Sequence, residues 1–203
     1  MALRIIFLWM CVSLPALGAP SILILGDSLS AGYGLDSGQS WVDQLSKELE
    51  QSIGIDITVL NASISGETTA GGLSRLPGLM NRHSPEYVLI ALGANDGLRG
   101  LPLDGLKDNL LAIIKHVRSR NSIPVYAGIE LPRNYGGPYN RAFRMTQNAV
   151  AQESAVPYLS FLLEPIALDR NLFQADGLHP TLAAQSIIAL HVARFLQTTV
   201  FLK

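Results

Sequence analysis

Short runs of apolar residues alternate along the chain with longer segments whose apolar residues recur at helical spacing. A run that is apolar at nearly every position predicts a strand buried on both faces of a sheet, because a half-exposed strand would alternate. These runs lie at 22–25, 57–60, 87–92, 123–129 and 157–162. Segments with helical spacing lie at 40–52, 69–82, 104–120, 138–153 and 180–198. Strands that alternate with helices predict parallel βαβ units, so we expect an α/β fold.

The predicted architecture is a flavodoxin-like, three-layer open sheet of about five parallel strands with helices on both faces. Local signals refine several helices. Ser40 and Asp43 have the spacing of a capping pair at the start of the first helix. Pro77 and Gly78 predict an interruption of the second helix, and Pro180 suits the first turn of the last one.

The length and the charge of the chain limit the classes of function that it can have. At 203 residues it is long enough for one domain with a full core and short for two. A net charge of -1 and 15% charged residues argue against a nucleic-acid partner, which needs a concentrated basic surface. We therefore expect one compact domain with two buried sheet faces.

The first residues carry the pattern of a secretory signal peptide. Arg4 gives a positive start, residues 5–14 are almost entirely apolar, and the small residues near Gly18 suit cleavage after that position. The stretch is short for a membrane span, and an uncleaved anchor is the alternative. We expect a signal peptide at 1–18 and a single domain at 19–203, exported to the periplasm or secreted. Cys11 is the sole cysteine, so the mature chain would contain neither a disulfide nor a thiol nucleophile.

Polar residues stand at the ends of the first three predicted strands and just before the last helix. Ser28 follows the first strand, Gly66 the second and Asn95 the third. Asp176 and His179 precede the last helix. Because the carboxyl ends of parallel strands open on one edge of a sheet, these residues can converge in the crevice where such folds bind ligands.

This combination of residue types suits nucleophilic catalysis by a serine. A serine hydroxyl needs a base to remove its proton, and His179 can be that base. Asp176, three residues earlier, can accept the other imidazole N–H and orient the ring. The backbone N–H groups of Ser28 and Gly66 and the side-chain amide of Asn95 suit an oxyanion hole.

Each of these residues also has a plainer interpretation. Ser28 would cap the helix that follows it, and Gly66 and Asn95 would be turn residues. Asp27 and Asp96 are better explained as loop supports that accept N–H bonds than as catalytic groups. The sequence supplies no recognisable metal site, so we expect no metal and no cofactor. Taken together, the plainer interpretations require several coincidences at adjacent strand ends.

Four blocks of residues, in order along the chain, resemble those of the GDSL, or SGNH, hydrolases. They are Gly26-Asp27-Ser28-Leu29, Gly66, Asn95-Asp96 and Asp176-x-x-His179. The stretches at 61–66, 95–100 and 131–136 extend the resemblance to exported bacterial members with thioesterase, lysophospholipase and arylesterase activities. The resemblance covers essentially the whole mature chain, and four blocks in order are far more specific than a lone GDSL tetrapeptide.

The resemblance implies the SGNH hydrolase fold and a serine acyl-ester and thioester hydrolase that forms an acyl-enzyme. It implies a catalytic triad of Ser28, Asp176 and His179, and an oxyanion hole of Ser28, Gly66 and Asn95. The family commonly has a glycine at the position of Ala94. The additional methyl group should matter only if that backbone needs a positive φ.

Implied substrates are acyl thioesters, lysophospholipids and small aryl or alkyl esters, bound by a monomer without nucleic acid or a stable membrane anchor. Apolar residues in the strand-end loops are candidates for the acyl groove: Leu76, Leu98, Leu101, Leu131 and Tyr135. The segment 69–80, with its glycines, is a candidate mobile loop over the acyl chain. Two alternatives stay open: a carbohydrate acetylesterase of the same family, and a non-catalytic domain that binds phosphate at the turn after the first strand.

Overall fold

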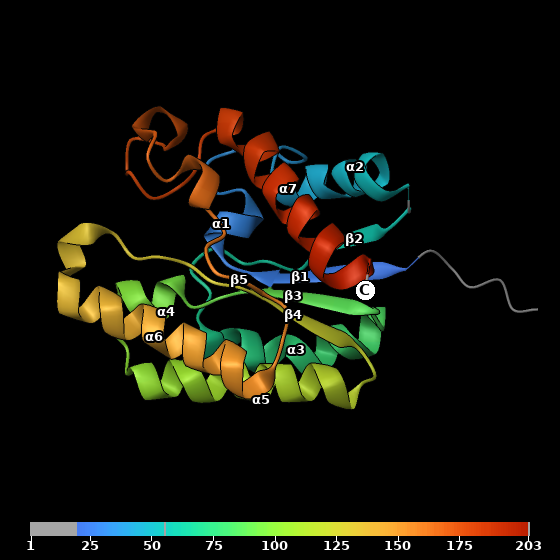
Figure 1. Cartoon of the computed structure of the whole chain (residues 1–203), viewed down its shortest axis with the longest axis horizontal. Helices are drawn as coiled ribbons and strands as arrows, with labels where there is room; N and C mark the ends of the chain where they lie inside the picture. The colour runs from blue at the N-terminus through green and yellow to red at the C-terminus, as the bar shows by residue number, and fades with distance from the viewer. Residues whose placement is uncertain (1–19, 55, 203) are drawn as a thin grey trace, which may run out of the picture.

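The computed structural model describes residues 20–54 and 56–202, and these contain one parallel sheet in the order β2-β1-β3-β4-β5 (Figure 1). All four neighbouring pairs of strands are parallel. The predicted α/β fold is confirmed. The strands are β1 (Ser21–Gly26), β2 (Thr58–Asn61), β3 (Tyr87–Ala91), β4 (Ile123–Ala127) and β5 (Tyr158–Leu159).

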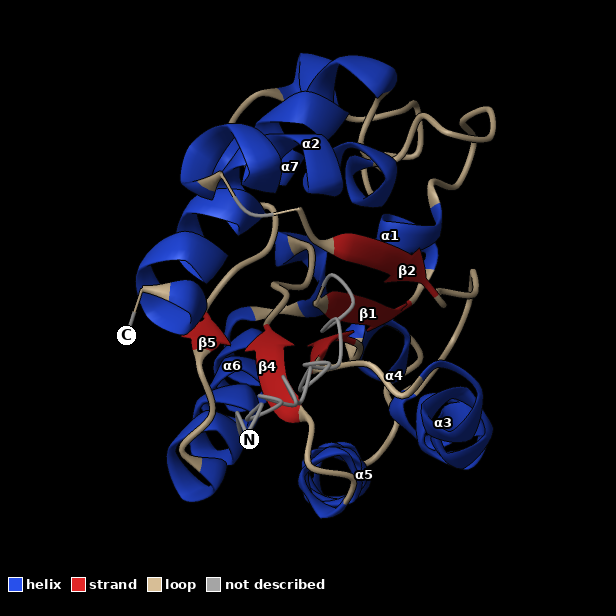
Figure 2. Ribbon diagram, turned by 90° about the vertical axis from the view of Figure 1, so that its right-hand side faces the viewer, coloured by secondary structure: helices blue, strands red, loops and turns tan. Residues whose placement is uncertain are grey.

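Helices cover both faces of this sheet, as predicted. Figures 1 and 2 show α2 and α7 on one face and α3, α5 and α6 on the other. The helices are α1 (Ser28–Ala31), α2 (Trp41–Ile53), α3 (Thr69–His83), α4 (Ala94–Leu98), α5 (Leu103–Ser119), α6 (Gly137–Ser154) and α7 (Leu182–Leu196). Short 3₁₀ turns lie at Arg133–Tyr135, Glu164–Ile166 and Arg170–Leu172, and a π turn at Gln197–Phe201 ends the described chain.

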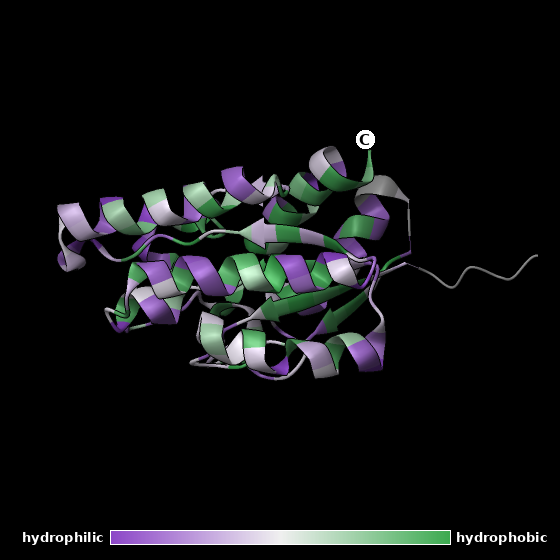
Figure 3. Cartoon of the chain, turned by 90° about the horizontal axis from the view of Figure 1, so that it is seen from below, coloured by the Kyte–Doolittle hydropathy of each residue, from purple (hydrophilic) through white to green (hydrophobic). Residues whose placement is uncertain are grey.

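The buried core explains why the apolar runs became strands. Every residue of β1 from Ile22 to Gly26 is buried, and its two neighbours, β2 and β3, pair with it in parallel. Figure 3 shows the strands as mostly hydrophobic, whereas the helices alternate between hydrophobic and hydrophilic residues. The predicted cap of α2 is also confirmed, because Ser40 and Asp43 form a complete capping box.

Several predicted boundaries were wrong. No break occurs at Pro77 and Gly78, since α3 runs through both. Pro77 lies on an exposed side of the helix, while Leu76 and Met80 are buried, so packing outweighs the backbone hydrogen bond that proline removes. The last helix begins after its N-cap Thr181, which leaves Pro180 outside the helix. The fifth strand is only two residues long, because the 3₁₀ turn at Glu164–Ile166 follows closely.

The predicted leader at 1–18, including Cys11, lies outside the described residues. Among the helices of the part that the structure describes, none is long and apolar enough to cross a membrane. The carboxyl ends of β1 and β3 lie next to each other in the sheet, with Gly26 paired to Ala91. This edge positions the candidate site.

Candidate active site

Ser28 begins the short helix α1 directly after the central strand β1. Asp27 caps this helix, and its Oδ1 accepts the backbone N–H of Leu29 at 3.0 Å. The turn requires glycine at position 26, because a Cβ there would lie 2.8 Å from the side chains of Ser30 and Ser63. A buried strand and a tight turn therefore hold the Ser28 hydroxyl at the edge of the sheet.

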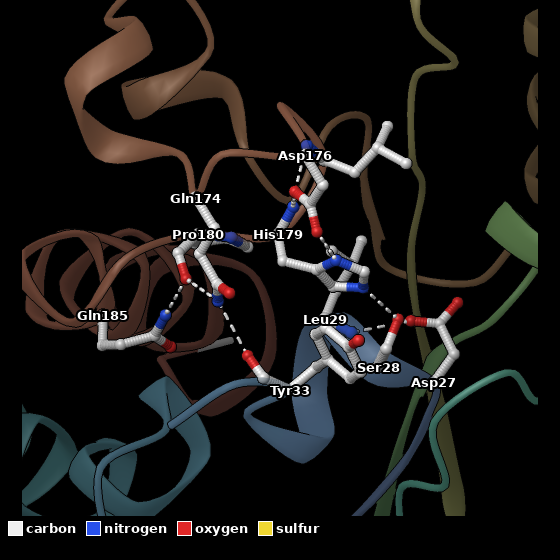
Figure 4. Close-up of polar contacts among 10 residues, drawn as sticks. Asp27, Ser28, Leu29, Tyr33, Gln174, Asp176, His179, Pro180 and Gln185 are labelled. Atoms are coloured by element: carbon white, nitrogen blue, oxygen red, sulfur yellow. Dashed lines mark hydrogen bonds and ion pairs between the residues drawn. The ribbon is translucent and has the colours of Figure 1, made fainter. Parts of the chain in front are cut away.

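Three of the predicted residues form a continuous chain of hydrogen bonds (Figure 4). His179 Nε2 lies 2.9 Å from Ser28 Oγ, and His179 Nδ1 lies 2.7 Å from Asp176 Oδ2. The other carboxylate oxygen, Oδ1, accepts the backbone N–H groups of Leu178 and His179 at 2.9 and 3.0 Å. This geometry allows His179 to take a proton from Ser28 while Asp176 orients the imidazole ring.

The environment keeps Asp176 ionised. Burial raises the pKa of its carboxyl, but the hydrogen bonds from the His179 backbone, the imidazole and Leu178, together with the His179 charge, outweigh burial and lower that pKa to about 2. Asp176 is therefore a carboxylate over the whole neutral range and can accept the imidazole N–H.

The loop that carries Asp176 and His179 is closed by its own backbone. The Gln174 N–H donates to the His179 carbonyl at 2.7 Å, and the Thr181 N–H donates to the Leu172 carbonyl at 2.8 Å. We call residues 172–181 the base loop. Because its ends are tied together, the base and the carboxylate that orients it form one unit.

Three groups proposed as oxyanion donors lie in the wall of one pocket. Within the described residues, the backbone N–H groups of Ser28 and Gly66 donate no hydrogen bond. The Asn95 amide donates to the Glu67 carbonyl at 2.9 Å and, more weakly, to Asp27 Oδ2 at 3.3 Å. Gly66 has φ 81°, a conformation that favours glycine, so the residue type at this position is explained by the backbone.

Asp27 and Asp96 support the loops around the site, as predicted. Burial raises the pKa of Asp27 to about 6, against the lowering effects of the Leu29 N–H, the His179 charge and the Asn95 amide. Asp96 is buried and accepts the backbone N–H and the hydroxyl of Thr69, at 2.9 and 2.6 Å. Neither carboxylate is hydrogen-bonded to the imidazole in this structure.

The Ser28 hydroxyl opens into a pocket of about 490 Å³ whose wall is mainly apolar. Its apolar side chains come from the loops after β1, β3, β4 and β5 and from the base loop: Leu29, Leu98, Ile129, Leu131, Phe161, Leu163, Leu168, Phe173 and Leu178. Two charged side chains, Glu130 and Arg133, also line it. A mainly apolar pocket of this size suits a small ligand with an apolar part beside the Ser28 hydroxyl.

Of the five predicted groove residues, Leu98 and Leu131 line this pocket and the other three do not. Leu76 is 0% exposed, because its side of α3 packs into the core. Leu101 and Tyr135 are partly exposed outside the pocket wall, and the Tyr135 hydroxyl donates to the Leu98 carbonyl at 3.0 Å. The segment 69–80 is likewise no loop over the pocket, since it belongs to helix α3, which packs against α5.

Sequence reasoning missed much of the pocket wall. Tyr33 lies just past the Ser28 block, and its ring packs against His179. Phe161 and Leu168 come from the chain between β5 and the base loop, where short 3₁₀ turns leave no periodic pattern to detect. Leu168 is 91% exposed at the rim of the pocket, an unusual exposure that only the structure reveals.

Ala94 needs no positive φ, so its methyl group causes no backbone strain. Ala94 starts helix α4 and is not among the residues with positive φ, whereas the preceding Gly93 has φ 123°. The unusual backbone conformation therefore falls on Gly93, and the methyl group of Ala94 is accommodated in the pocket wall.

No group of three or more histidine, cysteine, aspartate or glutamate residues that could hold a metal ion occurs in residues 20–54 and 56–202. The groups around Ser28 are a hydroxyl, an imidazole, a carboxylate and N–H donors, in an arrangement that suits nucleophilic catalysis. Together with the parallel sheet, they define a serine hydrolase of the α/β class.

The chain belongs to the GDSL-like lipase/acylhydrolase family, whose model matches residues 24–187. The protein is therefore an enzyme, a serine hydrolase of acyl esters, and the family expected from the sequence is confirmed. It is similar to Esterase TesA of Pseudomonas aeruginosa, with 43% identity over 187 residues that cover 90% of this chain and 92% of the relative.

Two further similarities agree with this family. Thioesterase 1/protease 1/lysophospholipase L1 of Escherichia coli strain K12 is 42% identical over 185 residues, covering 91% of this chain and 87% of that protein. A crystal structure of TesA matches with a TM-score of 0.84 at 42% identity and covers 89% of this chain and 99% of its own. Both comparisons extend over nearly the full length of each partner.

Proposed function

We propose that the protein hydrolyses acyl esters and acyl thioesters, with Ser28 as the nucleophile, His179 as the general base and Asp176 as its orienting carboxylate. The observation that carries this proposal is the unbroken series of contacts from Ser28 Oγ to His179 and on to Asp176, at 2.9 and 2.7 Å. The Ser28 hydroxyl opens into the apolar pocket described above, where an acyl chain can lie next to it.

In the first half of the reaction, Ser28 Oγ attacks the acyl carbonyl carbon while its proton passes to His179 Nε2. The carbonyl oxygen becomes an oxyanion that receives the backbone N–H groups of Ser28 and Gly66 and the Asn95 amide. The tetrahedral intermediate collapses as the leaving alcohol or thiol takes the proton from His179. The product of this half is an acyl-enzyme on Ser28.

In the second half, water takes the place of the leaving group. His179 removes a proton from the water as it attacks the acyl carbonyl, and the same oxyanion donors stabilise the second intermediate. Collapse releases the carboxylic acid, and the proton on His179 returns to Ser28 Oγ. The enzyme is regenerated with no change in its redox state and no cofactor.

Asn95 has to redirect one hydrogen bond during this cycle. One amide hydrogen is committed to the Glu67 carbonyl at 2.9 Å, while the other makes the longer 3.3 Å contact with Asp27. The longer bond is the weaker one, so an oxyanion in the pocket would compete with Asp27 for that hydrogen. Asp27 thus holds the amide near its working position between turnovers.

The apolar pocket favours substrates with an acyl chain longer than acetyl. We propose acyl thioesters, lysophospholipids and small aryl or alkyl esters as substrates, in line with the names of the two relatives. A carbohydrate acetylesterase would use the same catalytic groups, but an acetyl group would leave most of the apolar wall uncovered. Family membership sets aside the non-catalytic phosphate-binding alternative.

We also propose that the protein is exported as a monomer consisting of one domain, residues 19–203, after removal of a signal peptide at 1–18. The support is the positive start and the apolar stretch of the leader. Cell fractionation followed by N-terminal sequencing tests this directly. A periplasmic product that starts at Ala19 supports the proposal, and a membrane-bound product that retains Met1 contradicts it.

Substitution Ser28→Ala tests the catalytic assignment. We expect kcat for a p-nitrophenyl ester to fall by about 10,000-fold or more, with little change in thermal midpoint, because the residue supplies the bond-forming atom. A fluorophosphonate should label the parent at Ser28 and not the variant. Ser74→Ala, on the exposed side of α3, is the matched control and should retain parental activity. A loss of only several-fold in Ser28→Ala would mean that another residue is the nucleophile.

A panel of substrates distinguishes the remaining possibilities. Acyl thioesters, lysophospholipids and acetylated sugars are compared at matched concentrations by kcat/KM. Preference for longer acyl groups supports the acyl-hydrolase proposal, whereas preference for acetylated sugars supports the acetylesterase. Activity should persist in excess EDTA, because no step of the proposed mechanism uses a metal.

A further inference from the structure

The ring of Tyr33 lies against the ring of His179. The two ring centroids are 4.3 Å apart and the planes are tilted by 34°, so much of the aromatic face is turned toward the imidazole. Tyr33 follows the end of α1, and it is 51% exposed at the mouth of the catalytic pocket. Figure 4 shows both side chains beside the Ser28 hydroxyl. A half-exposed aromatic ring therefore lies in contact with the proposed general base.

Gln174 fixes the segment of chain that presents this ring. Its side-chain amide donates to the Tyr33 carbonyl at 2.8 Å and to the Pro180 carbonyl at 3.0 Å, which joins the nucleophile's turn to the base loop (Figure 4). Gly34 leaves room for this amide, since a Cβ there would lie 2.5 Å from Gln174 Oε1. One side chain therefore holds Tyr33 and the base loop together.

A second amide ties the same two regions to the core. Buried Gln185 donates to the Thr181 carbonyl at 3.0 Å and accepts the backbone N–H of Trp41 at 2.9 Å. The Trp41 indole N–H in turn donates to the Leu29 carbonyl at 3.0 Å. Both the base loop and the helix that begins at Ser28 are thus anchored to α2 and α7, so the backbone segments that carry the two rings are held in place.

The face of an aromatic ring attracts a cation that lies within about 6 Å of its centroid. As the proposed general base, His179 becomes an imidazolium when it takes the Ser28 proton. Asp176 already stabilises that cation at Nδ1, and buried Asp27 acts on it through its charge. The Tyr33 face adds a third favourable contact, from the side that Asp176 and Ser28 leave open.

On this basis we infer that Tyr33 is a positioning residue for the general base: its ring holds His179 toward Ser28 and stabilises the imidazolium formed in each transition state. The inference rests on the proposed roles of Ser28 and His179. It assigns the aromatic face, and not the hydroxyl, as the active part of Tyr33.

Substitution of Tyr33 by leucine and by phenylalanine distinguishes the role of the aromatic face from that of the hydroxyl. Tyr33→Leu keeps apolar bulk but removes the π face, so we expect kcat for a short p-nitrophenyl ester to fall about 3- to 10-fold. KM should stay within about twofold, because the ring acts on the base rather than on this small substrate. Tyr33→Phe keeps the face and should retain parental kcat. The rate of fluorophosphonate labelling at Ser28 should follow the same order.

Two outcomes would overturn the inference: a Tyr33→Leu variant as fast as the parent, or an equal loss in the leucine and phenylalanine variants. Should the leucine variant fail to fold by circular dichroism, phenylalanines with increasing fluorine content at position 33 provide the same test with nearly constant size. Fluorine withdraws electron density from the ring face, so kcat should fall stepwise along that series, and a flat series refutes the role. Failure of the proposed function is distinguishable, because it would appear as activity that survives Ser28→Ala.

Discussion

Asp27, directly before Ser28 in the chain, places a carboxylate in the interior with 1% of its surface exposed. Burial raises the pKa of this group from 3.8 to about 6. Between those two values the folded protein holds the proton more tightly than the unfolded chain does. The free energy of unfolding contributed by Asp27 therefore decreases as pH rises through this window. The Asp27 carboxylate nevertheless has a role in the site, because it accepts hydrogen bonds from the Asn95 amide and the Leu29 N–H and so holds both in place.

Asp27→Asn should remove this pH dependence. Asparagine retains an acceptor for the Leu29 N–H but has no proton to lose, so the unfolding free energy of the variant should no longer decline between about pH 4 and about pH 6. The interval between 3.8 and about 6 corresponds to roughly 3 kcal/mol at most. Urea unfolding across that range, for the parent, Asp27→Asn and the exposed helix control Asp108→Asn, measures the difference. Equal slopes in the parent and Asp27→Asn would contradict the assignment.

Asn95 contributes the side-chain donor of the proposed oxyanion hole. Loss of one such donor typically costs about 100- to 1,000-fold in kcat. We expect that loss for Asn95→Ala, with a smaller effect on KM, since the contact strengthens only when the carbonyl oxygen becomes charged. Steady-state kinetics on a p-nitrophenyl ester measure both constants. Asn148→Ala, at an exposed position of α6, serves as control, and a loss below about tenfold in Asn95→Ala would rule out its role as a donor.

At the scale of elements, helix α3 shows how two glycines in one helix can serve different purposes. Gly72 is buried, and a Cβ there would collide with the side chain of Leu92, which is itself buried at the end of β3. Gly78 is exposed, and a Cβ there would meet nothing within 4 Å. Close packing of α3 on the sheet therefore requires glycine at the first position and not at the second.

Alanine substitutions at these two positions should have opposite effects on stability. Gly72→Ala should lower the free energy of unfolding by about 1 to 3 kcal/mol, because Leu92 has to move within the core. Gly78→Ala should raise it by about 0.5 to 1 kcal/mol, because alanine favours the helix. Each variant is the matched control for the other in thermal or urea unfolding. A loss of stability in Gly78→Ala, or a gain in Gly72→Ala, would contradict this account of α3.

At the scale of the whole molecule, the parts that the sequence predicted are those fixed by short-range patterns. Apolar runs such as 22–25 predicted the strands, and the family blocks predicted that Ser28 and His179 meet although they lie 151 residues apart. The pocket wall was harder. Leu76 and Leu98 are both apolar and both were predicted to line the acyl groove, but only the structure shows that Leu76 packs into the core while Leu98 lines the pocket. Phe161 lies between β5 and a 3₁₀ turn, and Leu168 lies between two such turns, so no periodic pattern indicates which way either side chain points.

The proposed catalytic groups belong to regions that differ in burial, and this difference affects how the enzyme responds to heating. Ser28 directly follows β1, a buried interior strand of the sheet. The base loop at 172–181 instead lies outside the sheet, between a 3₁₀ turn and α7. Segments with fewer buried contacts open at lower free energy than the core. On heating, the base loop should therefore open before the sheet unfolds. His179 would then separate from Ser28 but stay hydrogen-bonded to Asp176, since both belong to the base loop.

Ester hydrolysis should then decline at temperatures below the midpoint seen by far-ultraviolet circular dichroism, and it should return on cooling. Gln174→Ala removes the hydrogen bond that joins the base loop to the Tyr33 carbonyl and a second bond, to the Pro180 carbonyl, within the loop. The variant should therefore show a larger decrease in the temperature of inactivation than in the temperature of unfolding. If the midpoints of inactivation and unfolding coincide in both the parent and Gln174→Ala, the base loop and the sheet unfold together and this prediction is wrong. If inactivation occurs at a lower temperature than unfolding, mild heating inactivates the enzyme reversibly. Activity then returns on cooling, because only the base loop has opened and the sheet is still folded.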